Sequence, residues 1–432
     1  MADRRVVITG LGAVTSAGVG ADALWDSLVA GQSTVREITQ FDASAYPSTV
    51  AGEVQDFSAR KFVPKDYRKA VKVMARDIEL AVGAADVCFR DSGLITRGLE
   101  GEVNLDLKRL GCNIGAGLIA CELDELADAA QCSMIDGQFD IRTWGKEGIT
   151  QLTPLWLLKY LPNMLSCHVT IIHGAEGPSN CITCGDASGH LSLGETFYYI
   201  AENVCDLAIT GGAESKLNPL CLLRQHLLKR LNTDRQDAGA CRPFDVDHDG
   251  TVMGEGGGML ILEEMDHAAA RGATMYAEVV GFGAACDPKA IDVTAPTVGN
   301  VDMAIQNALT SAGVTPEQVG MIMPHGTGVA AEDALEQAAW KSIFGDRLAE
   351  IPAFTITGAI GSLFAGAGGA QLVAASKALA TQTVPASVNF TAPATGCELN
   401  LSAETRSMEF EYVVSVAFTV GGQSAAVVLK RV

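Results

Sequence analysis

The chain has 432 residues, of which 48% are hydrophobic and 19% are charged, and it contains 46 glycines. This composition excludes a disordered or fibrous protein and favours a compact α/β body, either as two lobes or as one large duplicated domain. The formal net charge of −20 argues against a nucleic-acid-binding protein, because binding to phosphates needs clustered Lys and Arg, so an anionic partner would need a local basic patch.

The N-terminal segment 1–18 predicts a strand followed by a loop. Basic residues precede an apolar run there, as in a signal peptide, but Gly10, Gly12 and Gly18 interrupt that run. The glycines also suggest a dinucleotide-binding loop, yet Thr15 occupies the third glycine position, so we favour a tight turn. No run in the chain reaches 18 apolar residues, so we expect no membrane-spanning segment.

Further along the chain, short β-rich segments bounded by glycine predict buried strands. They are RRVVITG (4–10), CDLAITGGAES (205–215), GGMLILEE (257–264), YAEVVGFG (276–283), VGMIMPHGTG (319–328) and YVVSVAF (412–418). Helical patterns over 299–313 and 332–343 lie between them, and this alternation predicts a largely parallel sheet with helices on its faces. LAITGGAES and VAFTVGGQS resemble each other, which suggests a duplication, and no low-complexity linker separates the halves.

Two motifs suggest metal sites, and each lacks a required feature. Segment 245–256 has the acidic spacing of an EF-hand loop, but Gly256 stands at the twelfth position, where a bidentate glutamate is needed. Cys181 and Cys184 form a CxxC pair, but residues three apart in a strand point to opposite faces. We expect a turn and buried cysteines instead, with no metal and no cofactor. The 12 cysteines show no disulfide framework, which indicates reduced thiols in a cytoplasmic protein.

Two polar residues stand at positions that favour an active site. In SNCITCGDASGH (179–190), Asp186 lies between small residues where a strand is predicted to turn into a helix. In MPHGTG, His325 ends a predicted strand beside glycines. A lone histidine is usually structural, but loops at strand ends carry function in α/β folds. The Gly/Ala-rich segment 355–372 indicates close helix packing.

Taken together, these motifs resemble the β-ketoacyl-carrier-protein synthases, the condensing enzymes of fatty-acid and polyketide synthesis. The likeness extends over nearly the whole chain. It is carried by RRVVITGLGAVTSAG, FDASAY, AGEVQDF, GPSNCIT, GGAES, RPFDVDHDGTVMGEGGGMLILEE, RGATMYAEVVGFG, PHGTG and the terminal Gly421-Gly422. The resemblance implies a thiolase-like, duplicated fold with α-β-α-β-α layers, and we expect an N-terminal half over 1–268 and a C-terminal half over 269–432.

In that family a cysteine at the N-terminus of a buried helix attacks an acyl thioester, while two histidines and a lysine assist. The resemblance places Asp186 at the cysteine and His325 at the first histidine. Ser362 stands where the second histidine belongs, Thr357 where the lysine belongs, and Val420 where the family has an aromatic gate residue beside the oxyanion site. Asp333 and Glu336 follow His325 as in the family.

Three of the four chemical groups are therefore absent. The family consists of acyltransferases, but we do not expect condensing activity from a member with this site. A carboxylate at a helix N-terminus is a stable anion and a poor acyl acceptor. The chain looks most like the non-condensing ketosynthase-β or chain-length-factor subunits, although those usually have glutamine where Asp186 stands. Two alternatives stay open. Asp186 and His325 could act as base and acid in decarboxylation, hydrolysis or dehydration of a thioester, or Cys184 could be a displaced nucleophile.

The resemblance also implies partners. We expect a homodimer, or a heterodimer with an active ketosynthase, and an acyl carrier protein as the substrate carrier. Carrier proteins are small and acidic, so they need a basic docking surface on this acidic chain. The sequence offers Lys65, Arg68, Lys69 and Lys72 at helical spacing, although such a charge run is also typical of a solvated helix face.

Overall fold

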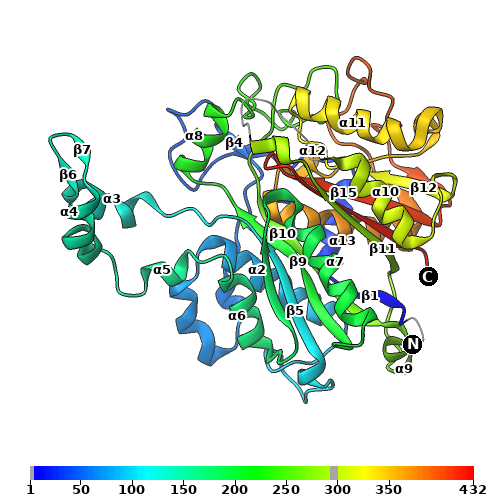
Figure 1. Cartoon of the computed structure of the whole chain (residues 1–432), viewed down its shortest axis with the longest axis horizontal. Coiled ribbons are helices and arrows are strands. Elements are labelled where there is room, and N and C mark those ends of the chain that lie inside the picture. The colour runs from blue at the N-terminus through cyan, green and yellow to red at the C-terminus, as the bar shows by residue number, and fades with distance from the viewer. Residues whose placement is uncertain (1–3, 292–299) are drawn as a thin grey trace.

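The computed structural model describes residues 4–291 and 300–432 and contains one large mixed sheet (Figure 1). The strands lie in the order β12-β15-β16-β11-β1-β10-β9-β5-β8, with β2 paired to β1. Their bounds are β1 Val6–Thr15, β2 Gly18–Val19, β5 Leu110–Ala116, β8 Ser179–Thr183, β9 Leu207–Ser215, β10 Glu255–Glu264, β11 Ala277–Cys286, β12 Val319–Met323, β15 Tyr412–Phe418 and β16 Gln423–Lys430. All six strands expected from the sequence are present.

The prediction of a largely parallel sheet is wrong. Among the strands of residues 4–291 and 300–432, only β12–β15, β5–β8 and β5–β9 pair in parallel, and the other neighbours in the sheet are antiparallel. The sequence pattern of alternating strands and helices cannot distinguish parallel from antiparallel pairing. For example, β15 and β16 are adjacent and joined by the short turn around Gly422, which has φ +91°. A turn of that length forces its two strands to run in opposite directions.

The duplication is visible in the strand pairing. In the N-terminal half, β5 and β9 are parallel, and β9, β10 and β1 follow as antiparallel neighbours. In the C-terminal half, β12 and β15 are parallel, and β15, β16 and β11 are antiparallel neighbours in the same order. The two halves meet where β1 pairs with β11, from Val6 opposite Val279 to Ile8 opposite Ala277. One sheet therefore runs through both halves.

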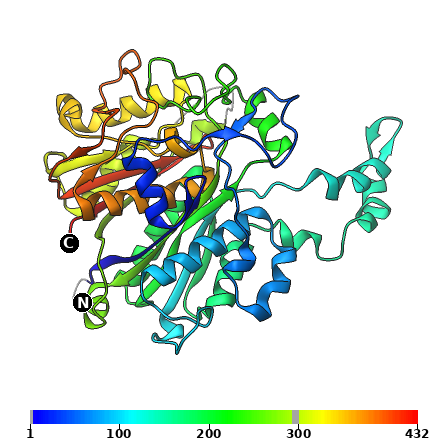
Figure 2. The same ribbon diagram turned by 180° about the vertical axis from the view of Figure 1, so that it is seen from behind.

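Two helices occupy the middle of the molecule, between the two sets of strands (Figures 1 and 2). Both α7 (Ser188–Ala201) and α13 (Ala367–Thr381) contact strands of the two halves. Outer helices complete the layers: α2 (Arg76–Asp91) and α6 (Met164–His173) cover the N-terminal strands, and α10 (Val301–Ala312) and α11 (Ala330–Phe344) lie on the C-terminal side. This is the α-β-α-β-α arrangement expected from the sequence. The helices α10 and α11 match the two predicted helices, except that residue 299 falls outside the described residues.

Close packing of the middle layer depends on small residues. A Cβ at Gly189 of α7 would lie 2.7 Å from the backbone N of Gly369 in α13. Because no side chain fits at that separation, glycine is required there. The interpretation of segment 355–372 as a closely packed helix is confirmed in α13. The apolar core around α7 and α13 includes residues from both halves, from Val6 to Leu429.

Residues between β5 and α6 form an arm that projects from the body in both views (Figures 1 and 2). The arm contains α3 (Leu123–Cys132), β6 (Met134–Ile135), β7 (Gln138–Phe139), α4 (Ile141–Lys146) and α5 (Trp156–Lys159). The remaining α-helices and strands of the described residues are α1 (Ala21–Val29), β3 (Arg36–Glu37), β4 (Val50–Ala51), α8 (Pro219–Leu227), α9 (Met265–Ala270), α12 (Thr357–Ile360), β13 (Thr383–Val384) and β14 (Arg406–Ser407), and short 3₁₀ helices lie between them. Within 4–291 and 300–432, no helix is long and apolar enough to cross a membrane.

Candidate functional site

Asp186 lies in a single 3₁₀ turn, Gly185–Ala187, between the end of β8 and the start of α7. Gly185 has φ +56°, and a Cβ there would lie 2.6 Å from Thr419 Oγ1, so the turn requires glycine. The Asp186 side chain is buried, and its Oδ1 atom has no hydrogen-bond partner among the described residues. The turn predicted from the sequence is therefore present, with the carboxylate pointing into the interior.

His325 follows β12 in a loop that is held by two acidic side chains of α11. Glu336 Oε1 accepts a hydrogen bond from the His325 backbone N–H at 2.7 Å, and Glu336 Oε2 accepts one from Gly326 at 2.9 Å. Asp333 Oδ1 accepts backbone hydrogen bonds from Thr327 and Gly328. The acidic residues that follow His325 in the sequence thus fix the backbone of the histidine loop.

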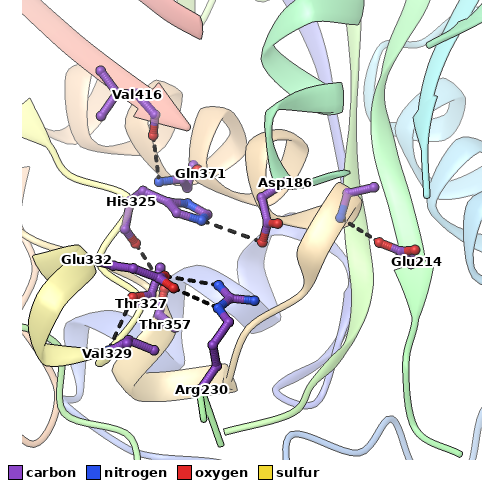
Figure 3. Close-up of polar contacts among 12 residues, drawn as sticks. Asp186, Glu214, Arg230, His325, Thr327, Val329, Glu332, Thr357, Gln371 and Val416 are labelled. Carbon is purple, nitrogen blue, oxygen red and sulfur yellow. Dashed lines mark hydrogen bonds and ion pairs between the residues drawn. The ribbon is translucent and has the colours of Figure 1, made fainter. Parts of the chain in front are cut away.

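The structure brings Asp186 and His325 together across the two halves of the molecule (Figure 3). The distance from His325 Nε2 to Asp186 Oδ1 is 3.6 Å. Burial disfavours the charged form of both groups. For Asp186, the polar interaction with the facing His325 imidazole and the charge of Arg230 outweigh burial and lower the pKa. For His325, Asp186, Glu336 and Glu332 outweigh burial and raise the pKa. The site therefore favours a carboxylate facing an imidazolium.

A second buried ion pair lies beside the first, and it was not predicted from the sequence. Arg230 donates to Glu332 through Nε at 2.7 Å and through Nη2 at 3.0 Å, and its Nη1 donates to Gln225 Oε1 at 3.0 Å. Figure 3 shows its guanidinium directed toward the Asp186 and His325 side chains. Arg230 and Glu332 are 102 positions apart in the chain, so no local pattern connects them. Their pairing depends on the fold.

The structure shows the surroundings of Thr357, Ser362 and Val420, the residues that the sequence resemblance places at the other catalytic positions. Thr357 donates its hydroxyl to the His325 carbonyl at 3.1 Å, so it lies beside the histidine loop but has no charge. Ser362 is buried, and its backbone N–H donates to Val252 O. Val420 is half-buried in the turn between β15 and β16. In the described part of the chain, Thr357 is the one of these three that forms a hydrogen bond with His325.

Two further residues border His325 and were missed in the sequence. The Phe418 ring lies 5.0 Å from the His325 ring, centroid to centroid, at an interplanar angle of 72°. Gln371 of α13 is fully buried and donates to the carbonyls of Pro324 and Val416 at 3.3 Å, which ties the histidine loop to β15. The Gly/Ala-rich pattern around Gln371 indicated only packing. A single amide side chain among these small apolar residues is the sequence signal that could have identified Gln371.

Cys184 precedes the Asp186 turn and is half-buried. Burial raises the pKa of its thiol, with the nearby Cys286 as a smaller cause, so the nucleophilic thiolate is disfavoured. The sulfur of its CxxC neighbour, Cys181, donates to the Pro162 carbonyl at 3.3 Å. Among the described residues, no cation offsets this shift at Cys184, as activation of a catalytic thiol requires.

The acidic loop that resembled an EF-hand is used to hold the backbone. Asp245 Oδ2 accepts backbone hydrogen bonds from Thr391 at 2.6 Å and from Ala392 at 3.2 Å, and its Oδ1 accepts one from Asp247. Among the residues that the structure describes, no group of three or more His, Cys, Asp or Glu side chains is arranged to hold a metal ion.

The predicted basic helix is present as a 3₁₀ helix, Lys65–Val73. The side chains of Lys65, Arg68, Lys69 and Lys72 are exposed, and none of them makes an ion pair within the described part of the chain. In a 3₁₀ helix, residues three apart are aligned, so Lys65 lies above Arg68 and Lys69 above Lys72. We call these four residues the basic patch.

Comparison with known proteins gives matches over the whole chain. Family models for the N-terminal and C-terminal domains of β-ketoacyl synthase match residues 3–268 and 276–391. A 3-oxoacyl-[acyl-carrier-protein] synthase 2 from Synechocystis sp. is 33% identical over 99% of this chain and 98% of its own. The ishigamide ketosynthase/chain length factor is similar with a TM-score of 0.84 and 26% identity over 100% of both chains. A type II polyketide ketosynthase solved in complex with its acyl-carrier protein has the same fold, with a TM-score of 0.82, 23% identity and full coverage of both chains.

Proposed function

Because the chain belongs to the β-ketoacyl synthase family, we propose that it is a non-condensing subunit of fatty-acid or polyketide synthesis that partners an active ketosynthase. The observation that carries this proposal is the buried Asp186 carboxylate in the turn before α7, where the family resemblance places the nucleophilic cysteine. His325 and Arg230 hold that carboxylate as an anion. A carboxylate so stabilised is a poor acyl acceptor, and it repels the negative charge that develops on a thioester oxygen.

The residues around Asp186 support the same conclusion. Decarboxylation of a malonyl thioester in the family uses a second histidine and a lysine, and Ser362 and Thr357 supply neither an imidazole nor an amine. Thr357 instead donates its hydroxyl to the His325 backbone. The changes extend over several positions of the site, so replacing Asp186 alone would not make a condensing enzyme.

Two surface features support a dimeric assembly. Strand β8 is the edge of the sheet, and Ser179, Asn180 and Thr183 in it are exposed. An edge strand with free backbone groups is suited to pairing with another chain. The arm exposes large apolar side chains, namely Leu123, Met134, Ile135, Phe139, Ile141, Ile149, Leu155, Leu157 and Leu158. We expect these surfaces to be covered by an active ketosynthase or by a second copy.

We also expect an acyl carrier protein to deliver substrate to this assembly, with the basic patch as a docking surface. Its four exposed cations form no ion pair with the residues that the structure describes, in a chain of net charge −20, so they offer the local positive field that an acidic carrier needs. All 12 cysteines are free, which fits the cytoplasmic location that we expect.

The proposal is tested by purifying the chain alone and with an active ketosynthase encoded beside it, and by following malonyl and acyl carrier-protein substrates with mass spectrometry. We expect no condensation by the chain alone, a stable complex with the ketosynthase, and a changed product length when the chain is present. A homodimer that never alters the product of the ketosynthase would contradict the proposal.

A second candidate function is favoured by the separation of 3.6 Å between Asp186 and His325. In hydrolysis of a thioester, Asp186 would take a proton from water, water oxygen would bond to the thioester carbon, and His325 would protonate the departing thiolate. Asp186→Asn removes the base in this reaction. Loss of turnover in that variant would establish the enzyme, and equal turnover in both proteins would exclude it.

A further inference from the structure

Glu214 and Lys216 form a buried ion pair at the end of β9, where the arm leaves the body. Glu214 is 1% exposed and Lys216 is 8% exposed. Lys216 Nζ also donates to the carbonyl of Leu118, which follows β5 as the chain enters the arm. A Cβ at Gly117 would lie 1.6 Å from Glu214 Oε1. The first residues of the arm therefore lie in direct contact with both members of the ion pair.

The other oxygen of Glu214 reaches the candidate site. Glu214 Oε2 accepts a hydrogen bond from the Ala365 N–H at 2.8 Å (Figure 3). Ala365 belongs to the 3₁₀ turn Phe364–Gly366, which contacts the Asp186 turn. Phe364 has a φ of +51°, a left-handed conformation that is unfavourable for a residue with a side chain. Surrounding contacts must therefore hold this turn in place, and the Glu214 carboxylate is one of them.

A third buried group offers Lys216 a second partner. Asp77, in the first turn of α2, is 4% exposed, and its Oδ1 has no hydrogen-bond partner among the described residues. Burial raises the pKa of Asp77 to about 7 against the attraction of Lys216, with Glu214 as a further cause. One ammonium therefore serves two carboxyl groups. If Lys216 moves toward Asp77, it releases Leu118 and Glu214 without leaving a buried cation unpaired.

We propose that Glu214 and Lys216 are positioning residues that couple the arm to the Asp186 turn. This inference rests on the assembly proposed above, in which a partner subunit covers the arm. A partner that holds the arm fixes the carbonyl to which Lys216 donates, and Glu214 then holds the neighbouring 3₁₀ turn against Asp186. In the free chain the arm moves, Lys216 turns toward the second carboxyl group, and the 3₁₀ turn loosens. Assembly therefore brings Asp186 and His325 closer together.

The test measures the pKa of His325, by NMR titration of the imidazole carbons, in the chain alone and with an excess of the ketosynthase encoded beside it. We expect the pKa to be about one unit higher in the complex, because a closer carboxylate favours the imidazolium. In Lys216→Met, and in Lys216→Met with Glu214→Gln, the two values should coincide. The double variant keeps an amide oxygen for the Ala365 N–H and leaves no unpaired charge, so it folds if the single variant does not.

The matched control is Lys377→Met. Lys377 also forms a largely buried ion pair, with Asp22, and its side chain is 17% exposed against 11% for Lys216. It lies in α13, away from the arm, so its loss should keep the difference of about one unit between the free and the assembled chain. A difference that persists in the double variant, or one that disappears in the control as well, would overturn the coupling.

The outcomes separate this inference from the proposed function. If the complex forms and the pKa of His325 is the same in both states, the coupling is absent and the proposed function stands. If the chain forms only a homodimer, the proposed partner is wrong, and Ile141→Asp with Leu157→Asp tests the inference by placing charges on exposed apolar positions of the arm to prevent assembly. The pKa of His325 should then fall by about one unit, and an unchanged pKa would refute the coupling. If neither assembly forms, both proposals fail.

Discussion

His325 Nε2 faces Asp186 Oδ1 at 3.6 Å, although one residue comes from the turn before α7 and the other from the loop after β12. Each charge stabilises the other in a buried environment that would otherwise disfavour both. The ionisation of either residue therefore depends on the presence of its partner, which makes the pair accessible to direct measurement.

Replacement of Asp186 by Asn should lower the pKa of His325 below its ordinary value of 6.5. Burial already opposes the imidazolium, and the variant removes the main group that offsets burial. NMR titration of the imidazole carbons checks this. His173 serves as the internal control, because burial, with the charge of Arg90 as a smaller cause, holds its pKa at about 3 and neither Asp186 nor His325 contributes to that shift. A His325 pKa that stays above 6.5 in the variant would show that Asp186 is not its main partner.

Replacement of Asp186 by Cys should fail to restore condensation. The variant supplies a thiol at the helix terminus, but Ser362 and Thr357 still provide no second histidine and no lysine. Each missing acid or base costs on the order of 10²–10⁴ in rate. Product analysis with malonyl and acyl carrier protein should therefore show a rate at least about 10²-fold below that of an active ketosynthase. A rate approaching that of the ketosynthase would contradict our assignment of these positions.

Replacement of Arg230 by Met should destabilise the protein by about 3–5 kcal/mol, because Glu332 is then left buried without a cation. Arg230→Met combined with Glu332→Leu should recover most of that loss, since no unpaired charge remains. Denaturant unfolding of the two single variants and the double variant measures the coupling. Additive effects would indicate that the two side chains do not depend on each other in the folded protein.

Stability should fall as the pH rises from about 4 to 7, and Asp77 should account for part of that fall. Burial, with the nearby Glu214 and against the attraction of Lys216, raises the pKa of Asp77 to about 7. The folded protein keeps a proton there that the unfolded chain releases near pH 4, so rising pH favours unfolding, by up to about 4 kcal/mol. Asp77→Asn should flatten the profile of unfolding midpoint against pH. Asp128→Asn on the exposed surface of α3 should leave it unchanged, and an equal slope in both variants would refute the role of Asp77.

Charge reversal in the basic patch, Arg68→Glu with Lys69→Glu, should weaken binding of the acyl carrier protein strongly at low salt and little at high salt. Screening reduces the interaction of exposed charges beyond about 8–10 Å at physiological ionic strength. Binding assays across a salt series check the difference. Unchanged affinity at low salt would leave the patch as ordinary solvated surface, and would favour entry of substrate through the partner subunit.

The sequence predicted several strands of the sheet, the layered fold and the meeting of Asp186 with His325, because these depend on local patterns and on a resemblance that extends along the chain. It did not predict β5 or β16. The Asp186 turn is an example: Gly185, Asp186 and Ala187 are neighbours, and their size and order alone indicate a tight strand-to-helix turn. His325 was identified in the same way, from the strand before it and the glycines after it.

What the sequence could not predict depends on contacts between distant segments. Arg230 and Glu332 each look like ordinary surface charges, and only the fold buries them together. Gln371 appeared as one polar residue in a packing helix, but its amide holds the histidine loop from the other side of the site. The predicted parallel direction of neighbouring strands was also wrong, because the alternation of strands and helices along the sequence does not determine which strands become neighbours in the sheet.

The short seam between β1 and β11 has a consequence for synthesis on the ribosome. All strands of the N-terminal half are complete at Glu264, while β11 begins only at Ala277 and β16, which packs against the same core, ends at Lys430. Until the last strands emerge, the nascent half exposes the free edge of β1 and the apolar side of α7 that α13 later covers. We therefore expect the newly made chain to engage chaperones until β16 has emerged, and its two halves to be insoluble when they are expressed as separate polypeptides.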